Sequence, residues 1–144
     1  MPDQPTEITA RWKGGLGFEA FNAQGVSVRM DSPSDSPHLA PMELVLMALA
    51  GCTGMDTADI LRKKRQELAS MEIRVRGTRA EDHPRVYTGI ELEYVVSGAD
   101  LSAEAVARSI ELSLTKYCSV GAMLTPSVPI TTSFRIVPGA GKTI

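Results

Sequence analysis

The chain has few cysteines, few aromatic side chains and no strong excess of charge. Its 144 residues include 2 cysteines, 5% aromatic residues and a formal net charge of -2 at pH 7. A balance this close to neutral argues against nucleic acid and anionic membranes as main partners, because both select basic surfaces. Two widely separated cysteines, Cys52 and Cys118, do not make a disulfide scaffold. In a reducing compartment such thiols are either buried and inert or redox-active.

Long hydrophobic runs are also missing. The first residues, Met1 to Thr6, have no basic start and no apolar stretch, so we expect no secretory signal. The longest apolar run, Leu44 to Cys52, is about half of what a membrane-spanning helix needs. We therefore expect a cytoplasmic protein. Because no linker or repeat divides the sequence, residues 1–144 are predicted to form a single domain.

The first third of the chain predicts short strands followed by a long helix. Strands are expected at residues 6–13, 16–22 and 26–31, separated by glycine-containing turns, and a Ser/Pro-rich loop follows at 32–38. Proline suits the first position of a helix, so a helix is predicted from Pro41 to about Gln66. Its first half is apolar on all sides, which is typical of a helix buried at the centre of a core.

The rest of the chain predicts two more strands, a second helix and a last strand. Apolar and polar residues alternate over residues 71–76 and 90–96, with a turn at 82–84 between them. Ser102 is placed to cap the second helix. The apolar stripe of that helix is Val106, Ile110, Leu114, Tyr117 and Cys118. Ile130, Phe134 and Ile136 mark the last strand.

The resulting order, βββ-α-ββ-α-β, groups strands together instead of alternating them one for one with helices. This order predicts the α+β class with mainly antiparallel sheets. Six short strands of one chain cannot easily cover a helix that is apolar all round. We therefore expect an intertwined homodimer in which two sheets wrap around two central helices.

Most residues that could carry chemistry show no functional spacing. His38 and His83 lie in proline-containing loops without metal-ligand spacing to either cysteine, so no metal and no cofactor are expected. Cys52 lies where the apolar run turns polar, and Cys118 lies at the end of the second predicted helix. Composition alone leaves open whether these are inert core thiols or a reactive pair. A pair requires the two helices to bring the Cα atoms within about 7 Å.

The chemistry open to such a pair is peroxide reduction. A thiolate attacks the O–O bond and becomes a sulfenic acid, and a second thiol condenses with it to a disulfide. The attacking thiol must be ionised. Asp56 lies one turn beyond Cys52 on the same face, and an unpaired carboxylate there would raise the thiol pKa. We therefore expect an arginine of the early strands, Arg11 or Arg29, beside Cys52. The alternative is that Asp56 is an ordinary solvated helix residue.

Two segments around the cysteines resemble the OsmC/Ohr family. Residues 40–56, APMELVLMALAGCTGMD, are similar to the central helix of that family, and residues 106–120, VARSIELSLTKYCSV, are similar to its second-cysteine segment. The order of strands and helices agrees over nearly the whole chain. The chain is more similar to the OsmC-like branch than to the organic-hydroperoxide-resistance branch.

The resemblance implies a homodimer with two active sites at the subunit interface, and an enzyme that reduces organic hydroperoxides. It also implies a dithiol reductant such as a lipoyl group, with Cys52 as the peroxidatic thiol and Cys118 as the resolving thiol. The peroxidases of the family have a glutamate directly after the proline that begins the helix, and an arginine in the first hairpin loop. Here Met42 follows Pro41, with Glu43 next, and the loop at 13–16 contains no arginine. Glu43 is also explained as an acid that complements the helix dipole.

Three hypotheses follow from the sequence. The first is a thiol-dependent hydroperoxide reductase that protects against oxidative or osmotic stress. The second is a non-peroxidatic OsmC-like protein that senses redox state or binds an apolar ligand. The third is a structural dimer with inert cysteines. Peroxide-driven loss of free thiols separates the first hypothesis from the other two.

Overall fold

The computed structural model describes residues 4–32 and 37–138. Residues 33–36 of the predicted loop lie outside the described residues. The chain divides into two compact units, Met1–Val45 and Leu46–Ile144.

The first unit contains an antiparallel sheet of three short strands. Its strands are β1 (Thr9–Trp12), β2 (Phe18–Phe21) and β3 (Ser27–Met30), in the spatial order β1-β2-β3. The two turns contain Gly14, Gly15 and Gly25, whose φ angles of 98°, 56° and 84° are readily adopted only by glycine. All three strands lie within the ranges predicted from the sequence.

Helix α1 (Pro41–Lys63) begins where the proline predicts. The backbone N–H of Ala40 donates to Glu43 Oε1 at 2.9 Å, which satisfies an N–H group at the start of the helix. The helix ends at Lys63, before the predicted end at Gln66, because Arg65 has a left-handed φ of 61°.

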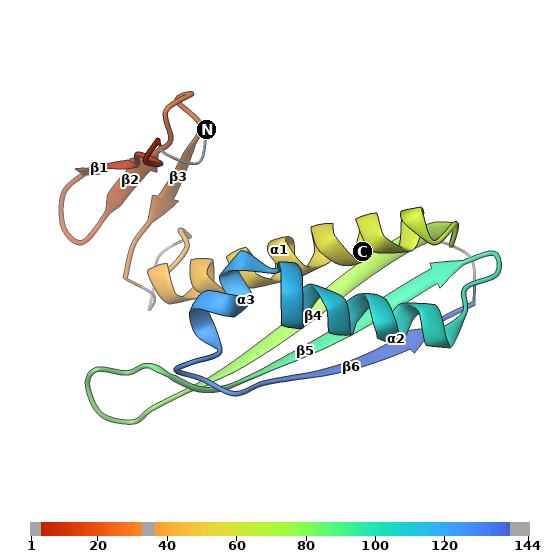
Figure 1. The fold of residues 1–144 in the computed structure, drawn as a ribbon. Coiled ribbons are helices and arrows are strands. Elements are labelled where there is room, and N and C mark those ends of the chain that lie inside the picture. Colours follow the sequence, from red (N-terminus) through yellow and green to blue (C-terminus); the bar gives the residue numbers. More distant parts are fainter. Residues whose placement is uncertain (1–3, 33–36, 139–144) are drawn as a thin grey trace. The chain divides into compact units, whose positions relative to one another are not determined.

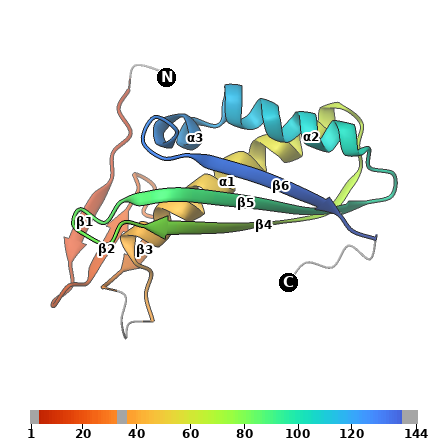
Figure 2. The same cartoon turned by 90° about the horizontal axis from the view of Figure 1, so that it is seen from below.

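The second unit is a mixed three-stranded sheet covered by helices. The sheet order is β4-β5-β6, from β4 (Leu68–Arg79), β5 (Tyr87–Gly98) and β6 (Ile130–Ile136). Strands β4 and β5 are antiparallel, and β6 is parallel to β5. The part of α1 from Leu46 onward and α2 (Ala103–Leu112) cover the same face of this sheet (Figures 1 and 2). The largest fully buried apolar side chains of the unit come from α1, β5 and α2: Leu49, Leu61, Ile90, Leu92, Tyr94, Val96 and Val106.

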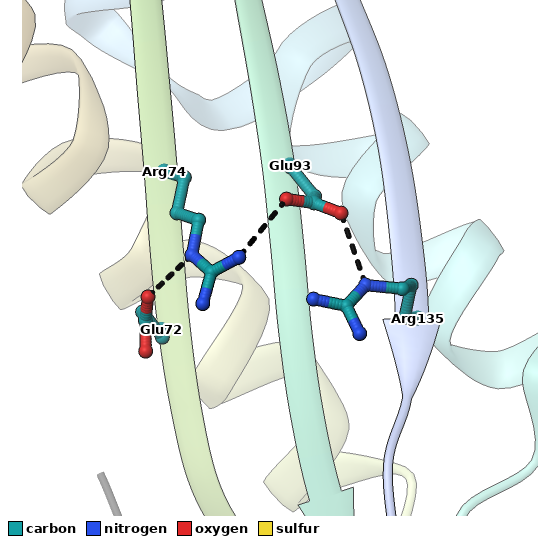
Figure 3. A network of polar contacts seen from close by, with 4 residues as sticks. All are labelled: Glu72, Arg74, Glu93 and Arg135. Carbon is teal, nitrogen blue, oxygen red and sulfur yellow. Dashed lines mark hydrogen bonds and ion pairs between the residues drawn. The ribbon is translucent and has the colours of Figure 1, made fainter. Parts of the chain in front are cut away.

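Charged side chains occupy the opposite face of the sheet. Glu93 on the central strand contacts Arg74 at 3.7 Å and Arg135 at 3.0 Å, and Arg74 also pairs with Glu72 (Figure 3). The two arginine side chains are 51% exposed, so water and salt weaken these ion pairs and each contributes little to stability. Their main effect is to keep this face of the sheet polar.

The segment around Cys118 differs from the prediction of one continuous helix. Helix α2 ends at Leu112 and is followed by a π-helical turn, η1 (Ser113–Tyr117), in which Cys118 N donates to Ser113 O at 2.7 Å. The extra residue of a π turn changes which side chains face the core. Tyr117 is therefore 52% exposed, and its predicted place on the apolar stripe is wrong. Cys118 itself adopts an extended conformation, and an unpredicted helix, α3 (Ser119–Leu124), follows it.

Helix α1 is not buried on all sides within one chain. Its buried residues are Leu49, Thr53, Thr57 and Leu61, spaced four apart along one face. Met47 is 49% exposed and Met55 is 75% exposed. The prediction of a helix enclosed all round is thus not met by a single copy.

By length and composition, α1 is long and apolar enough to span a membrane, alone among the helices within residues 4–32 and 37–138. The expectation that its apolar run is too short therefore holds only for the uninterrupted run, because an 18-residue window of the helix has a mean hydropathy of 1.5. Core helices of soluble proteins pass the same test, so this composition is weak evidence for a membrane.

Candidate active site

The two cysteines meet in the second unit. Cys52 is on α1, and Cys118 caps the N-terminus of α3. The two Sγ atoms and a carboxylate oxygen of Asp56 all lie within 4.8 Å of one another. A disulfide has an S–S length of about 2.05 Å, so a small side-chain movement would bring the sulfurs into bonding distance. The structure therefore brings together the two thiols that the sequence analysis singled out.

The two thiols have different surroundings. Cys118 is 3% exposed, whereas Cys52 is partly exposed. Burial raises the pKa of the Cys118 thiol to about 11; the Gly121 N–H, which donates to its sulfur at 3.2 Å, opposes this rise, while Cys52 and Asp56 add to it. At neutral pH the Cys118 thiol is thus uncharged. Cys52 is the more accessible sulfur for a molecule arriving from solvent.

A chain of buried hydroxyl groups leads to Asp56. Thr53 Oγ1 is 2.8 Å from Tyr94 Oη and 2.8 Å from Ser113 Oγ, and Ser113 Oγ donates to Asp56 Oδ2 at 3.1 Å. An ionised carboxylate only accepts hydrogen bonds, so Ser113 donates to Asp56, Thr53 donates to Ser113, and Tyr94 donates to Thr53. Burial raises the pKa of Tyr94 to about 12, which keeps its hydroxyl a donor. The network fixes the Asp56 carboxylate beside the sulfurs.

Sequence reasoning did not single out the three hydroxyl residues of this network. Thr53 and Ser113 are fully buried polar residues on α1 and at the start of η1. A sequence signal existed, because Ser113 and Thr53 fall at helical positions on otherwise apolar faces, where a small polar residue needs a partner. The identity of that partner could not be read from the sequence, since Thr53 and Ser113 are 60 positions apart.

The other predicted site residues lie in the first unit. The guanidinium of Arg11 is 5.2 Å from the centre of the Phe21 ring. Arg29 Nε is buried and has no hydrogen-bond acceptor among the described residues. Glu43 accepts the N–H of Ala40 and so has the capping role that the helix dipole predicts. That one of these arginines ionises Cys52 stays a prediction.

A cleft opens beside the cluster. Its volume is about 330 Å³, and it is lined by Asp56, Asp59, Ile60, Lys63, Lys64, Leu112 and Tyr117. The cleft reaches Asp56 and therefore the neighbourhood of both sulfurs. Neither cysteine lines this cleft or the larger hollow of about 870 Å³ near Arg65 and Leu68, and Asp56 lines only the smaller cleft.

Two cysteines and one aspartate also form a possible donor set for a soft metal ion. Thiolate and carboxylate ligands are accepted by Zn²⁺, but closed structural zinc sites use four protein ligands. The described residues supply three here: Cys52, Asp56 and Cys118. The spacing of the histidines predicts no metal site, whereas this group combines side chains from distant segments of the chain.

Comparison with known proteins shows the family of this chain. A family model described as OsmC-like protein matches residues 33–133. Protein YhfA of Escherichia coli (strain K12) is 42% identical over 131 residues, which cover 91% of this chain and 98% of YhfA. A hypothetical protein from Aquifex aeolicus VF5 has a crystal structure that is 32% identical, with a TM-score of 0.85, covering 94% of this chain and 98% of that one.

More distant solved structures share the fold. The organic hydroperoxide resistance protein OhrB of Bacillus subtilis is 18% identical with a TM-score of 0.66, covering 92% of this chain and 98% of OhrB. The predicted α+β fold is thus confirmed as the OsmC-like fold. The family match over residues 33–133 and the 42% identical relative show that the chain belongs to the OsmC-like protein family.

Proposed function

We propose that this protein is a thiol-dependent peroxidase that reduces organic hydroperoxides. The observation that carries the proposal is the placement of the Cys52 and Cys118 sulfurs within 4.8 Å of each other. Two thiols from separate helices at this spacing can form and release a disulfide. Membership of the OsmC-like family supports organic hydroperoxides as the substrate class.

The reaction has two oxidative steps. The Cys52 thiolate attacks the terminal oxygen of R–O–OH, so that an S–O bond forms, the O–O bond breaks and the alkoxide takes up a proton to become the alcohol. The Cys118 sulfur then attacks the Cys52 sulfenic acid, which gives the Cys52–Cys118 disulfide and water. A dithiol reductant, such as a lipoyl group, restores both thiols by exchange.

The roles of the two cysteines follow from their exposure. Cys52 is partly exposed and Cys118 is buried, so a peroxide reaches Cys52 first. The buried, uncharged Cys118 thiol is a poor first nucleophile, because thiolates and not thiols attack peroxides. Cys52 is therefore the peroxidatic residue and Cys118 the resolving residue. The cleft that Asp56 lines lies next to this cluster, although neither cysteine lines it.

The working unit is a homodimer in the cytoplasm. Exposed apolar residues on α1, among them Met47 and Met55, form a surface suited to a second copy of the chain. Both cysteines are free, which agrees with a cytoplasmic location, where thiols are kept reduced. Sedimentation should give a dimer mass, and Met55→Glu should weaken the dimer.

Peroxide consumption tests the catalytic proposal. The reduced protein, mixed with cumene hydroperoxide, should lose both thiols and gain a Cys52–Cys118 disulfide on mass mapping. Cys52→Ser should abolish peroxide consumption, and Cys118→Ser should accumulate a sulfenic acid that dimedone traps. The matched control is hydrogen peroxide, which the organic-peroxide enzyme should reduce more slowly.

Slow, unselective thiol oxidation would overturn the peroxidase proposal. Saturable binding of an apolar ligand without peroxide turnover would instead support an OsmC-like binding or redox-sensing protein. Thiols that react only after unfolding would support a structural dimer.

A further inference from the structure

Formation of the disulfide requires the Cys118 thiol to lose its proton, and a neighbouring residue can accept that proton. The Cys118 sulfur must attack the oxidised Cys52 as a thiolate, yet its thiol is buried and uncharged at neutral pH. A buried thiol of this kind reacts fast only if a base removes its proton as the new bond forms. The base must lie within reach of Cys118 and stay ionised.

Asp56 meets the geometric requirement. One of its carboxylate oxygens lies within 4.8 Å of both sulfurs. Ser113 holds the carboxylate through the 3.1 Å hydrogen bond to Oδ2. That serine is itself held by Thr53, which is hydrogen-bonded to Tyr94, so the carboxylate is linked to η1 and, through α1, to β5. An ordinary solvated helix residue would not be anchored in this way.

We propose that Asp56 is the proton acceptor for Cys118 during formation of the Cys52–Cys118 disulfide. This inference rests on the proposed function for its natural oxidant, the Cys52 sulfenic acid. Asp56 takes the proton of the Cys118 thiol while the sulfur lone pair forms the S–S bond. The S–O bond of the sulfenic acid breaks with its electron pair going to oxygen, and Asp56 returns the proton to that oxygen, so that water leaves.

Several charged groups surround the reacting atoms. The titratable groups that act on Cys118 are Cys52 and Asp56, both from α1. Tyr94 of β5 is linked to them through Thr53. The cleft beside Asp56 also carries Asp59, Lys63 and Lys64. Asp59 is paired with Lys63 and Arg62, which makes it a suitable control for loss of a carboxylate on the same helix.

The test starts from a mixed disulfide and not from a peroxide, so that it does not depend on peroxidase activity. Dithiobis(nitrobenzoate) modifies the more exposed Cys52 and releases one thionitrobenzoate. Attack by Cys118 on the mixed disulfide then releases a second thionitrobenzoate, which stopped-flow absorbance follows. Cys118→Ser should release the first equivalent only, which confirms that the second release reports Cys118.

Asp56→Asn keeps the size of the side chain and an acceptor oxygen for Ser113. We expect it to slow the second release about 100-fold near neutral pH, which is the usual effect of removing a general base. The remaining rate should rise about tenfold per pH unit, because only pre-formed Cys118 thiolate then attacks. The unmodified protein and Asp59→Asn should show a fast release that is nearly constant between about pH 7 and pH 9.

The direction of the rate change in Asp56→Asn shows whether Asp56 acts as a general base or only through its negative charge. The Asp56 charge helps to raise the Cys118 pKa, so its removal alone would make the thiolate more abundant and the attack faster. A slower attack in Asp56→Asn therefore cannot come from the lost charge. Circular dichroism shows whether the variant is folded.

Two outcomes overturn the proposal. One is an Asp56→Asn rate equal to that of Asp59→Asn. The other needs no variant: a second release in the unmodified protein that itself rises tenfold per pH unit would mean that no base acts. A fast second release together with no peroxide consumption would instead refute the proposed function and leave the role of Asp56 standing.

Discussion

The sulfur of Cys118 accepts a hydrogen bond from the backbone N–H of Gly121 at 3.2 Å, so a buried thiol caps helix α3. Oxygen-bearing side chains usually occupy this position, because they accept the free N–H groups of the first turn more strongly. A Cβ on Gly121 would lie 3.3 Å from the same sulfur, so the close approach of the backbone to Cys118 favours a residue without a side chain. The cap fixes the sulfur where it faces Cys52.

The first prediction concerns stability at high pH. The pKa of Cys118 is raised from 9.0 to about 11 in the folded state, mainly by burial. Folding therefore favours the protonated thiol, and this stabilisation is fully present below about pH 9 and lost as pH rises toward 11. Because each pKa unit corresponds to about 1.4 kcal/mol, the loss is at most about 3 kcal/mol.

Urea unfolding of the reduced protein at a series of pH values measures this loss. Burial also raises the pKa of Tyr94, from 10.0 to about 12, so Tyr94 likewise lowers stability at high pH. The comparison therefore needs Cys118→Ala, which keeps Tyr94. The unfolding free energy of the unmodified protein should fall more steeply above pH 9 than that of Cys118→Ala. An equally steep fall of the unfolding free energy with pH in the two proteins would contradict the prediction.

The second prediction concerns the hydroxyl network. Thr53→Val leaves the hydroxyls of Tyr94 and Ser113 buried without their shared partner, which should cost about 2–3 kcal/mol of unfolding free energy. Tyr94→Phe removes the hydroxyl that donates to Thr53 and leaves no buried donor without a partner, so the unfolding free energy should fall by only about 1 kcal/mol. In a double-mutant cycle followed by urea unfolding, the combined loss should be smaller than the sum of the two. Additive losses would mean that the hydroxyl groups act independently.

Most of the fold could be predicted because its signals are local. The proline at the start of α1, the glycine turns of the first sheet and the alternation along β4 and β5 each depend on neighbouring residues. The break after α2 could not be predicted in the same way. Residues 113–118 continue an apolar helical pattern, and the π turn becomes visible only from the hydrogen bond between Cys118 N and Ser113 O. For this reason the sequence pattern wrongly puts Tyr117 on the apolar stripe and does not predict α3.

The site was predicted only in part because it joins distant segments. The two cysteines could be singled out as residue types, and Asp56 as a neighbour of Cys52 on its helix. The sulfur-to-sulfur approach depends on how α1 packs against the segment around Cys118, which no local pattern encodes. The anchoring of Asp56 by Ser113 depends on the same packing. The sequence therefore leaves open whether Asp56 is an ordinary solvated residue. In the structure its carboxylate accepts a hydrogen bond from Ser113.

The third prediction uses glycines of the second sheet. A Cβ at Gly98 would lie 2.2 Å from the backbone oxygen of Glu67, and a Cβ at Gly77 would lie 2.6 Å from the ring of Tyr87. Gly98→Ala forces the backbone apart, and Gly77→Ala displaces a buried ring, so each should lower the unfolding free energy by about 1–3 kcal/mol. Gly89→Ala is the matched control on β5, because its Cβ would meet nothing within 4 Å. Thermal unfolding should show Gly89→Ala close to the unmodified protein, and a loss as large as that of Gly98→Ala would contradict the steric explanation.

The fourth prediction asks which arginine ionises Cys52. The two predicted arginines differ in their surroundings, since Arg11 lies over the Phe21 ring and Arg29 has a buried Nε without an acceptor among residues 4–32 and 37–138. A buried guanidinium N–H without a partner is costly, and an anion is the group that best satisfies it. Of the two arginines predicted to serve Cys52, Arg29 is therefore the better candidate for holding an anion, and we expect its loss to matter more than that of Arg11.

Alkylation of Cys52 by iodoacetamide, measured in the Cys118→Ser background, reports the thiolate fraction. Arg29→Gln should slow alkylation near neutral pH about tenfold, because the loss of a cation disfavours the thiolate that iodoacetamide attacks. Arg11→Gln removes the same charge from the same sheet and should leave the rate nearly unchanged. Raising the pH should restore the Arg29→Gln rate, since the variant retains the thiol and only its ionisation is affected. Equal rates in the two variants at every pH would show that neither arginine activates Cys52, and the thiolate would then have to be stabilised by another group.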